Sequence, residues 1–244
     1  MNNLPTVTKN LLIINVLMFL ATIVAQTYNI ELDDYLGLHF VLAENFNAAQ
    51  LITYMFMHGG FTHVFFNMFA VWMFGRILEQ VWGPRRFLFY YLACGIGAAL
   101  IQEVVVGIQY WSLTSGLSPD VIDRVRDEGF KIIQQGMNYS DPTLGSLNIV
   151  LNGTTVGASG AVYAILLGFG VLFPNQSMFI FPLPFPIKAK YFVAGYALIE
   201  LWAGFANNPS DNVAHFAHLG GMLFGFFIIM YWKKKNRGNG YYYN

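Results

Sequence analysis

Six long apolar stretches dominate this chain of 244 residues and restrict what it can fold into. A bilayer core about 30 Å thick is crossed by a helix of roughly 20 mostly apolar residues. Charged residues make up only 11% of the chain, against about 25% in an average soluble domain. We therefore expect an all-α membrane protein, a six-helix bundle with spans near residues 11–28, 61–78, 87–106, 156–173, 191–205 and 213–232.

Basic residues orient these spans in the membrane. If six spans alternate in direction, ten of the thirteen basic residues fall on one side, and basic flanks mark the cytoplasmic side. These ten are Lys9, Arg76, Arg85, Arg86, Lys188, Lys190, Lys233, Lys234, Lys235 and Arg237. We expect a cytoplasmic N-terminus at residues 1–10, a membrane domain at 11–232 and a basic cytoplasmic tail at 233–244, in the plasma or inner membrane.

Two external segments are more than connectors. The first, residues 31–50, mixes acidic and apolar residues, as a segment lying at the membrane interface would. The second, residues 109–153, contains Ser118-Pro119-Asp120, a pattern typical of a helix start, and an apolar stripe follows it up to Gly136. We expect an amphipathic helix there; the alternative is a solvated loop with a helical turn or two.

Polar side chains lie at one depth in three different spans. His63 and Asn67 fall in the first two turns of span two, and Ser159 lies about one turn into span four. His215 and His218 flank the same level of span six. At 1.5 Å per residue, all of them would lie about 5–12 Å below the outer surface. Polar residues within spans are costly, so this layer is a candidate functional site.

A layer of this composition is suited to acyl transfer to water. A serine hydroxyl is a weak nucleophile that needs a general base, and a neutral histidine can accept its proton. The tetrahedral intermediate then needs hydrogen-bond donors aimed at its oxyanion. The candidates are the backbone N–H of Ser159, which is free in an early helical turn, and the side chains of His63 and Asn67.

Small residues on spans four and six indicate which histidine meets the serine. They recur at every fourth position, as Gly160, Ala164, Gly168, Gly221 and Gly225. Such faces let two helices approach closely, which would bring Ser159 against His218. His218 shares its face with the glycines, whereas His215 is offset by a turn and is the competing base. Tyr163, one turn below Ser159, could pack its ring on the base.

A carboxylate that would orient the histidine is harder to find. Asp211 precedes span six in an external loop, and Glu200 lies within span five, where it should be paired or protonated. Neither has an obvious place beside His218. We therefore expect a Ser–His dyad without a carboxylate member.

Four short motifs mark these spans. They are Gly157-Ala158-Ser159-Gly160 followed by Tyr163, His58-x4-His63-x3-Asn67, Ala217-His218-x2-Gly221-x3-Gly225, and Glu79-x3-Gly83. A G-x-S-G motif alone is weak, but the ordered set across spans two, four and six is highly specific. On these residues the chain resembles the rhomboid intramembrane serine proteases, and the six-helix plan covers the whole chain apart from the external insert.

The resemblance implies a role for each matching residue. Ser159 would be the nucleophile and His218 the general base, with an oxyanion site from His63, Asn67 and the backbone of Ser159. The supporting positions are Gly157, Gly160, Tyr163, Gly221 and Gly225. The implied partners are single-span membrane proteins as substrates and the lipid bilayer. We expect no cofactor, no metal and no nucleic acid.

One departure and two alternatives accompany this interpretation. Many family members carry a Trp-Arg pair in the first external loop, where this chain has Ala49-Gln50. A catalytically inactive relative would act as a binding or escort factor for membrane proteins, but such proteins usually lack the serine or the histidine. A small transporter predicts charged groups at mid-bilayer, and only Glu200 lies near that level.

Overall fold

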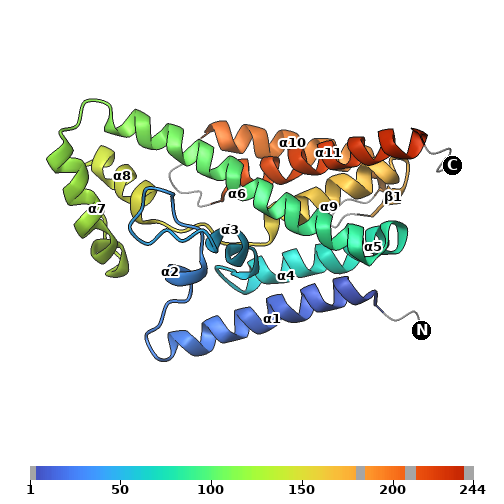
Figure 1. Cartoon of the computed structure of the whole chain (residues 1–244), viewed down its shortest axis with the longest axis horizontal. Coiled ribbons are helices and arrows are strands. Elements are labelled where there is room, and N and C mark those ends of the chain that lie inside the picture. The colour runs from blue at the N-terminus through green and yellow to red at the C-terminus, as the bar shows by residue number, and fades with distance from the viewer. Residues whose placement is uncertain (1–3, 180–184, 207–212, 239–244) are drawn as a thin grey trace.

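The computed structural model describes residues 4–179, 185–206 and 213–238, and these are mostly helical. The helices are α1 (Thr6–Gln26), α2 (Asp33–Leu36), α3 (Gln50–Thr53), α4 (Phe61–Ala70), α5 (Arg76–Trp82), α6 (Pro84–Thr114), α7 (Pro119–Gln134), α8 (Pro142–Asn152), α9 (Ser159–Leu172), α10 (Ala189–Ala206) and α11 (His215–Gly238). A 3₁₀ turn, η1 (Tyr54–Phe56), precedes α4, and a π-helical turn, η2 (Val71–Gly75), joins α4 to α5. Strands β1 (Ser177–Met178) and β2 (Ile187–Lys188) pair in an antiparallel hairpin. Figure 1 shows the long helices running along the longest axis of the molecule.

Each of the six expected stretches contains a helix. Four of the described helical segments are long and apolar enough to cross a membrane, and these are Thr6–Gln26, Phe61–Trp82, Pro84–Thr114 and His215–Lys235. The apolar helix α9 has only 14 residues, and α10 has 18. The membrane class and the all-α fold are therefore confirmed, while the number of helices that cross the bilayer stays a prediction.

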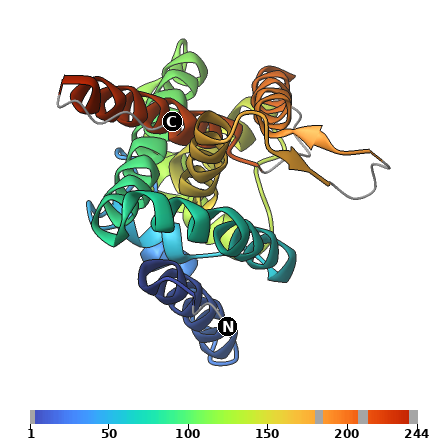
Figure 2. The same ribbon diagram turned by 90° about the vertical axis from the view of Figure 1, so that its right-hand side faces the viewer.

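Helix α9 lies at the centre of the bundle. It packs against α6, α11, α10 and α4, and most of its residues are buried by these neighbours. Figure 2, seen along the helices, shows α9 surrounded by the other long helices. The close approach expected from the small residues is confirmed where α9 crosses α11, because Gly221 faces the backbone of Gly160 and Gly225 faces Ala164. Gly168 packs instead against α5.

The insert at residues 109–153, which the sequence predicted to be external, contains two helices beyond the end of α6. The expected amphipathic helix is confirmed as α7, which begins at Pro119 with Ser118 at the N-cap position, although the Ser118 side chain makes no capping hydrogen bond. Helix α8 was not expected. Its start carries the same kind of signal, because the carboxylate of Asp141, just before Pro142, accepts hydrogen bonds from the N–H groups of Thr143 and Leu144 at 2.9 Å.

The loop at residues 31–50 packs against this insert. Phe40 forms a buried cluster with Val125, Leu147 and Leu151. His39 beside it is fully buried, and one of its ring nitrogens lies 2.9 Å from the carbonyl oxygen of Asp34. Phe40 and His39 therefore lie inside the protein, whereas Tyr35, Val41 and Leu42 of the same segment are exposed, and the place of the segment at the membrane interface stays a prediction.

Gln50, the second of the two residues that depart from the family pattern, holds this loop together. Its side-chain oxygen accepts hydrogen bonds from the N–H groups of His39 at 3.3 Å and Asn47 at 3.1 Å. Its amide donates to the carbonyl oxygens of Tyr35 at 3.2 Å and Asn45 at 3.0 Å. Buried backbone polar groups need such partners, so Gln50 has a structural role here.

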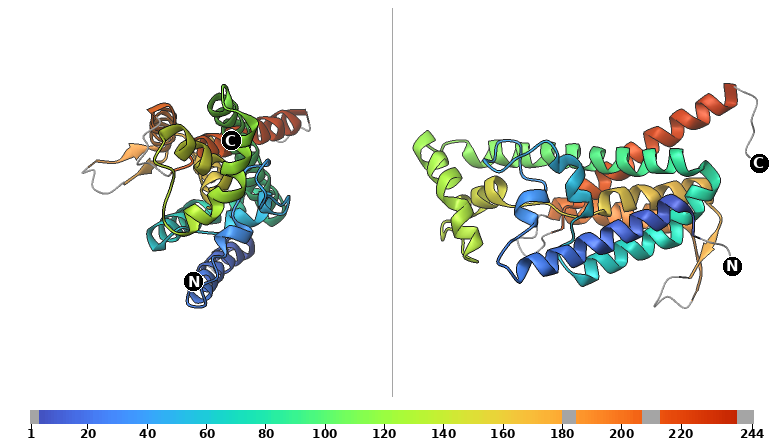
Figure 3. Two further views of the ribbon diagram at one scale, coloured as in Figure 1. Left: turned by 90° about the vertical axis from the view of Figure 1, so that its left-hand side faces the viewer. Right: turned by 60° about the horizontal axis from the view of Figure 1, so that its bottom comes forward.

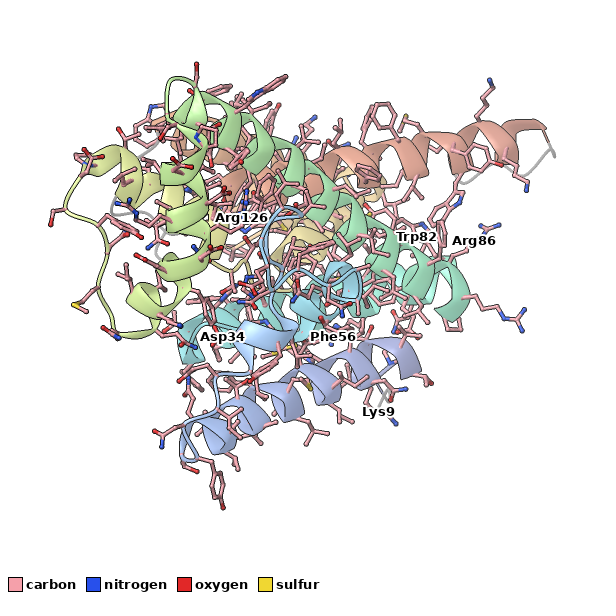
Figure 4. All side chains as sticks on the ribbon, turned by 60° about the vertical axis from the view of Figure 1, so that its left-hand side comes forward. Lys9, Asp34, Phe56, Trp82, Arg86 and Arg126 are labelled. Carbon is pink, nitrogen blue, oxygen red and sulfur yellow. The ribbon has the colours of Figure 1, made fainter. Side chains whose placement is uncertain are left out.

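Charged residues lie toward both ends of the bundle. The start of α1 and the end of α11 lie at one end, and α7 and α8 lie at the other (Figure 3). Figure 4 shows Lys9 and Arg86 toward the first end, and Asp34 and Arg126 toward the second. Asp211 and tail residues 239–244, which the sequence analysis placed outside and inside respectively, lie outside the described residues.

Candidate active site

Ser159 occupies the first position of the central helix α9. The segment before it is pinned to other loops, since Thr155 pairs with Leu38 and the N–H of Gly157 donates to the carbonyl oxygen of Tyr54 at 2.9 Å. The first N–H groups of a helix have no partner within the helix, so the start of α9 presents free donors beside this serine. The fold thus fixes both the hydroxyl and the backbone N–H of Ser159.

His218, and not His215, lies beside this hydroxyl. The Nε2 atom of His218 is 2.8 Å from the Oγ atom of Ser159, a normal hydrogen-bond distance. The ring of Tyr163 stacks on the imidazole with centroids 4.2 Å apart and planes 8° from parallel. Because Tyr163 is one turn from Ser159 on α9, one helix supplies both the serine and the ring that packs on the histidine.

A carboxylate completes the contacts of this histidine. The Oε2 atom of Glu200, on α10, lies 2.8 Å from Nδ1 of His218 and 2.6 Å from Nδ1 of His215. The hydroxyl of Tyr163 donates a hydrogen bond to Oε1 of the same carboxylate. The expectation that His218 has no carboxylate partner is therefore wrong. One feature of the sequence could have indicated this partner. Glu200 is the single acid within the fifth apolar stretch, and an acid within a membrane span needs a partner.

The same three residues are the group among the described residues that could hold a metal ion. One ligand atom from each of Glu200, His215 and His218 lies within 4.8 Å of the others. Two imidazole nitrogens and a carboxylate oxygen are ligands that zinc accepts. These atoms also hydrogen-bond directly to one another, and the bonds account for their closeness without an ion.

Gly157 lies against both His63 and Ser159. Gly157 has a φ of 137°, and a Cβ atom there would lie 2.9 Å from the Nε2 and Cε1 atoms of His63 and 3.3 Å from Oγ of Ser159. The imidazole of His63 therefore lies close to Gly157, on the side of this residue that also faces the serine. A side chain at this position would crowd His63, and glycine tolerates this backbone conformation.

Asn67 supplies a buried donor one turn further along α4. Its side chain is buried, and no described residue accepts a hydrogen bond from its Nδ2 atom. A buried N–H group without an acceptor is costly, so such groups in native proteins need an explanation. Because Asn67 lies four residues after His63, the two side chains share a helix face, and a bound oxyanion would satisfy both.

His58 lies behind His63 in the loop before α4. The two rings meet edge to face, with centroids 5.1 Å apart. Burial, and next the charge of His63, lower the pKa of His58 to about 4. The imidazole of His58 is therefore neutral at physiological pH and adds no positive charge beside His63.

Comparisons with known proteins show the family of this chain. The family model for the Rhomboid domain matches residues 45–122 and 133–235, and the interruption falls within α7. The chain is 26% identical over 179 residues to Rhomboid protein 1, mitochondrial, of Saccharomyces cerevisiae, covering 73% of this chain and 40% of the yeast protein. It is 28% identical to Rhomboid protease GluP of Bacillus subtilis, covering 93% of this chain and 34% of GluP. It is also 28% identical to Rhomboid protease AarA of Providencia stuartii, covering 71% of this chain and 52% of AarA.

The chain thus spans about half the length of these curated relatives or less. The match to the domain model includes every residue of the site described above. This protein belongs to the rhomboid family.

Proposed function

We propose that this protein is an intramembrane serine endopeptidase that hydrolyses peptide bonds in or near the transmembrane segments of single-span membrane proteins. The observation that carries the proposal is the 2.8 Å contact between Oγ of Ser159 and Nε2 of His218. Membership of a family that includes proteases such as GluP and AarA supports it.

The proposed reaction proceeds through an acyl-enzyme. Nε2 of His218 takes the proton of the Ser159 hydroxyl while Oγ attacks the carbonyl carbon of the scissile bond. The oxyanion that forms accepts hydrogen bonds from the backbone N–H of Ser159 and from the side chains of His63 and Asn67. The protonated His218 then gives its proton to the leaving amine, and the C–N bond breaks.

Deacylation repeats these steps with water. His218 removes a proton from a water molecule, whose oxygen attacks the ester carbonyl. Collapse of the second tetrahedral intermediate returns the proton to Oγ of Ser159 and releases the carboxylic acid product. The reaction needs no group beyond these side chains and water.

The short length of α9 supports access of water to the serine. Its 14 residues, at 1.5 Å each, span about 21 Å, which is less than a bilayer core of about 30 Å. With its far end near the opposite interface, Ser159 would lie several ångströms below the membrane surface. A peptide bond there is both within the membrane and within reach of solvent.

We further propose six spans, with both termini in the cytoplasm and the active site opening to the extracytoplasmic side of a plasma or inner membrane. Lys9 and Arg86 lie toward the end that would face the cytoplasm, in agreement with the excess of basic residues expected on that side (Figure 4). Relatives such as the yeast protein are named as mitochondrial, so the membrane itself has to be found by fractionation.

Cleavage of a membrane-anchored reporter tests the proposal. The purified full-length protein in detergent should cut a single-span reporter protein, and Ser159→Ala should abolish the cut. His218→Ala should do the same, whereas His215→Ala should retain measurable cleavage. Reporter binding without cleavage by the wild-type protein would favour the inactive binding or escort role instead.

A further inference from the structure

We propose that Glu200 is the third member of a Ser159–His218–Glu200 triad, in which its carboxylate holds His218 in the tautomer that acts as a base. The inference rests on the proposed protease function. It assigns a positioning role to a residue of α10, which carries none of the four motifs seen in the sequence.

The hydrogen bonds around Glu200 determine the tautomer of His218. An ionised carboxylate only accepts hydrogen bonds, so each group in contact with it must donate. Nδ1 of His218 therefore carries the proton, and Nε2 of the neutral ring presents a lone pair to the Ser159 hydroxyl 2.8 Å away. The opposite tautomer would put two donors face to face between His218 and Ser159.

The carboxylate is itself held from three sides. Tyr163 donates to Oε1, while His215 and His218 both contact Oε2. The exposed fraction of the Glu200 side chain is 7%, and that of the His218 side chain is 9%. Such an enclosed and fully bonded carboxylate has a fixed direction, which is what orienting an imidazole requires.

The position of Glu200 on α10 argues against a role in packing alone. Its neighbours Leu198, Ile199, Leu201 and Trp202 are all exposed on the protein surface, as befits residues in contact with lipid. Glu200 is the buried residue of this part of α10, and a carboxylate is an expensive choice where a leucine would pack as well. A function that needs the negative charge explains the choice.

Glu200→Gln is the informative substitution. The amide keeps the size of the side chain but replaces one of the two acceptor oxygens with a donor. The amide nitrogen can only donate, which favours the tautomer of His218 with its proton on Nε2. In Ser-His-Asp proteases the equivalent change lowers kcat by about 10⁴ through the wrong tautomer. We expect kcat to fall on the order of 10²–10⁴ here, with KM changed less than about threefold.

Two further variants separate positioning from stability. Glu200→Asp keeps the charge on a shorter side chain and should recover part of the kcat that Glu200→Gln loses. Glu103→Gln is the matched control, because Glu103 on α6 accepts a hydrogen bond from the N–H of Val41 at 2.8 Å, away from the site. This control should keep wild-type kcat. A thermal unfolding midpoint of Glu200→Gln close to the wild-type value would exclude a purely structural loss.

The tautomer can be observed directly in the full-length protein. Selective ¹⁵N labelling of the five histidines, with His218→Gln to assign the signal, distinguishes protonation at Nδ1 from protonation at Nε2 by NMR. We expect His218 to be protonated at Nδ1 in the wild-type protein and at Nε2 in Glu200→Gln. Glu200→Gln with kcat within threefold of wild type, or with an unchanged tautomer, would overturn the triad. A wild-type protein that never cleaves would instead overturn the proposed protease function. The tautomer of His218 would still show whether the Glu200 carboxylate fixes its proton at Nδ1.

Discussion

Gly221 on α11 lies directly against the backbone of Gly160 on α9. A Cβ atom at Gly221 would come within 1.9 Å of the carbonyl oxygen of Gly160, which no side chain can accommodate without moving a helix. Because Ser159 precedes Gly160 and His218 is one turn before Gly221, this crossing sets the distance between the hydroxyl and the imidazole.

The first prediction is that Gly221→Ala separates Ser159 from His218. The added methyl group has to push α11 away from α9, which should lower cleavage by at least about 10²-fold, because misplacement by about 1 Å can cost that much. The free energy of unfolding should fall by about 1–3 kcal/mol, as for other overpacked contacts. Reporter cleavage and thermal unfolding in detergent measure both effects. Gly195→Ala, where nothing lies within 4 Å of the new methyl group, is the matched control and should keep wild-type cleavage.

The second prediction concerns the unpaired donor of Asn67. Removing an oxyanion donor typically lowers kcat by about 10²–10³, so Asn67→Ala should do so with little change in KM. Its Nδ2 atom has no acceptor among the described residues, so the substitution removes a donor that contributes no hydrogen bond in the resting protein. The unfolding midpoint should therefore stay near the wild-type value or rise. A large loss of stability with unchanged kcat would contradict the oxyanion role.

The layer of polar residues at the candidate site was predictable from the sequence because short-range rules suffice for it. Helical rise sets the depth of Ser159, His63 and Asn67, and the small residues at every fourth position of two helices imply a close crossing. Those same positions distinguish His218 from His215, and the structure has the expected neighbour beside Ser159.

Glu200 was not predictable in the same way. Its contact with His218 depends on how α10 is rotated and how far it is shifted along α11, and no periodicity in the sequence fixes either quantity. The helices of the insert show the same limit. The apolar stripe of α7 was visible, but α8 is short and its start signal at Asp141-Pro142 gains meaning only from the packing of Leu147 and Leu151 against Val125.

The third prediction concerns Glu79, whose carboxylate caps α1 from a neighbouring helix. It accepts hydrogen bonds from the N–H of Val7 at 2.9 Å, the N–H of Thr8 at 2.7 Å and the hydroxyl of Thr8 at 2.8 Å. The residue before α1 is Pro5, which offers no side-chain cap. Glu79→Ala should lower the free energy of unfolding by about 2 kcal/mol, since a lost cap costs about 1 kcal/mol and bonds to a charged group cost more. At a temperature where the variant is folded, kcat should match the wild type, because no described contact joins Glu79 to Ser159; a kcat loss without destabilisation would contradict this.

The fourth prediction tests the orientation in the membrane. Cys94 is the single cysteine and is fully buried, so a cysteine introduced at the surface is the one that a maleimide can reach. Met137→Cys places a thiol after α7, and Arg85→Cys places one at the start of α6; both positions are exposed. In intact cells a membrane-impermeant maleimide should label Met137→Cys alone, and permeabilised cells should show labelling of both. The reverse pattern in intact cells would invert the proposed topology.

The last prediction concerns acid stability and follows from His58. Burial and the neighbouring His63 lower the pKa of His58 to about 4 from its ordinary value of 6.5. Below pH 6.5 the unfolded chain therefore binds a proton that the folded protein does not, so stability is lost as the pH falls from 6.5 toward 4. At 1.36 kcal/mol per pKa unit the loss approaches about 3 kcal/mol.

His58→Gln removes this titration, so its unfolding midpoint should depend less on pH in this window. Unfolding of both proteins is measured from pH 7.5 to 4.5, and the difference at pH 7.5, where His58 is neutral in both states, gives the packing cost of the substitution. The two stability curves should then converge as the pH falls, because only the wild-type protein pays for keeping a buried imidazole neutral. Curves that run parallel over the whole range would mean that His58 is protonated as readily in the folded protein as in the unfolded chain. Its burial against His63 would then not lower its pKa.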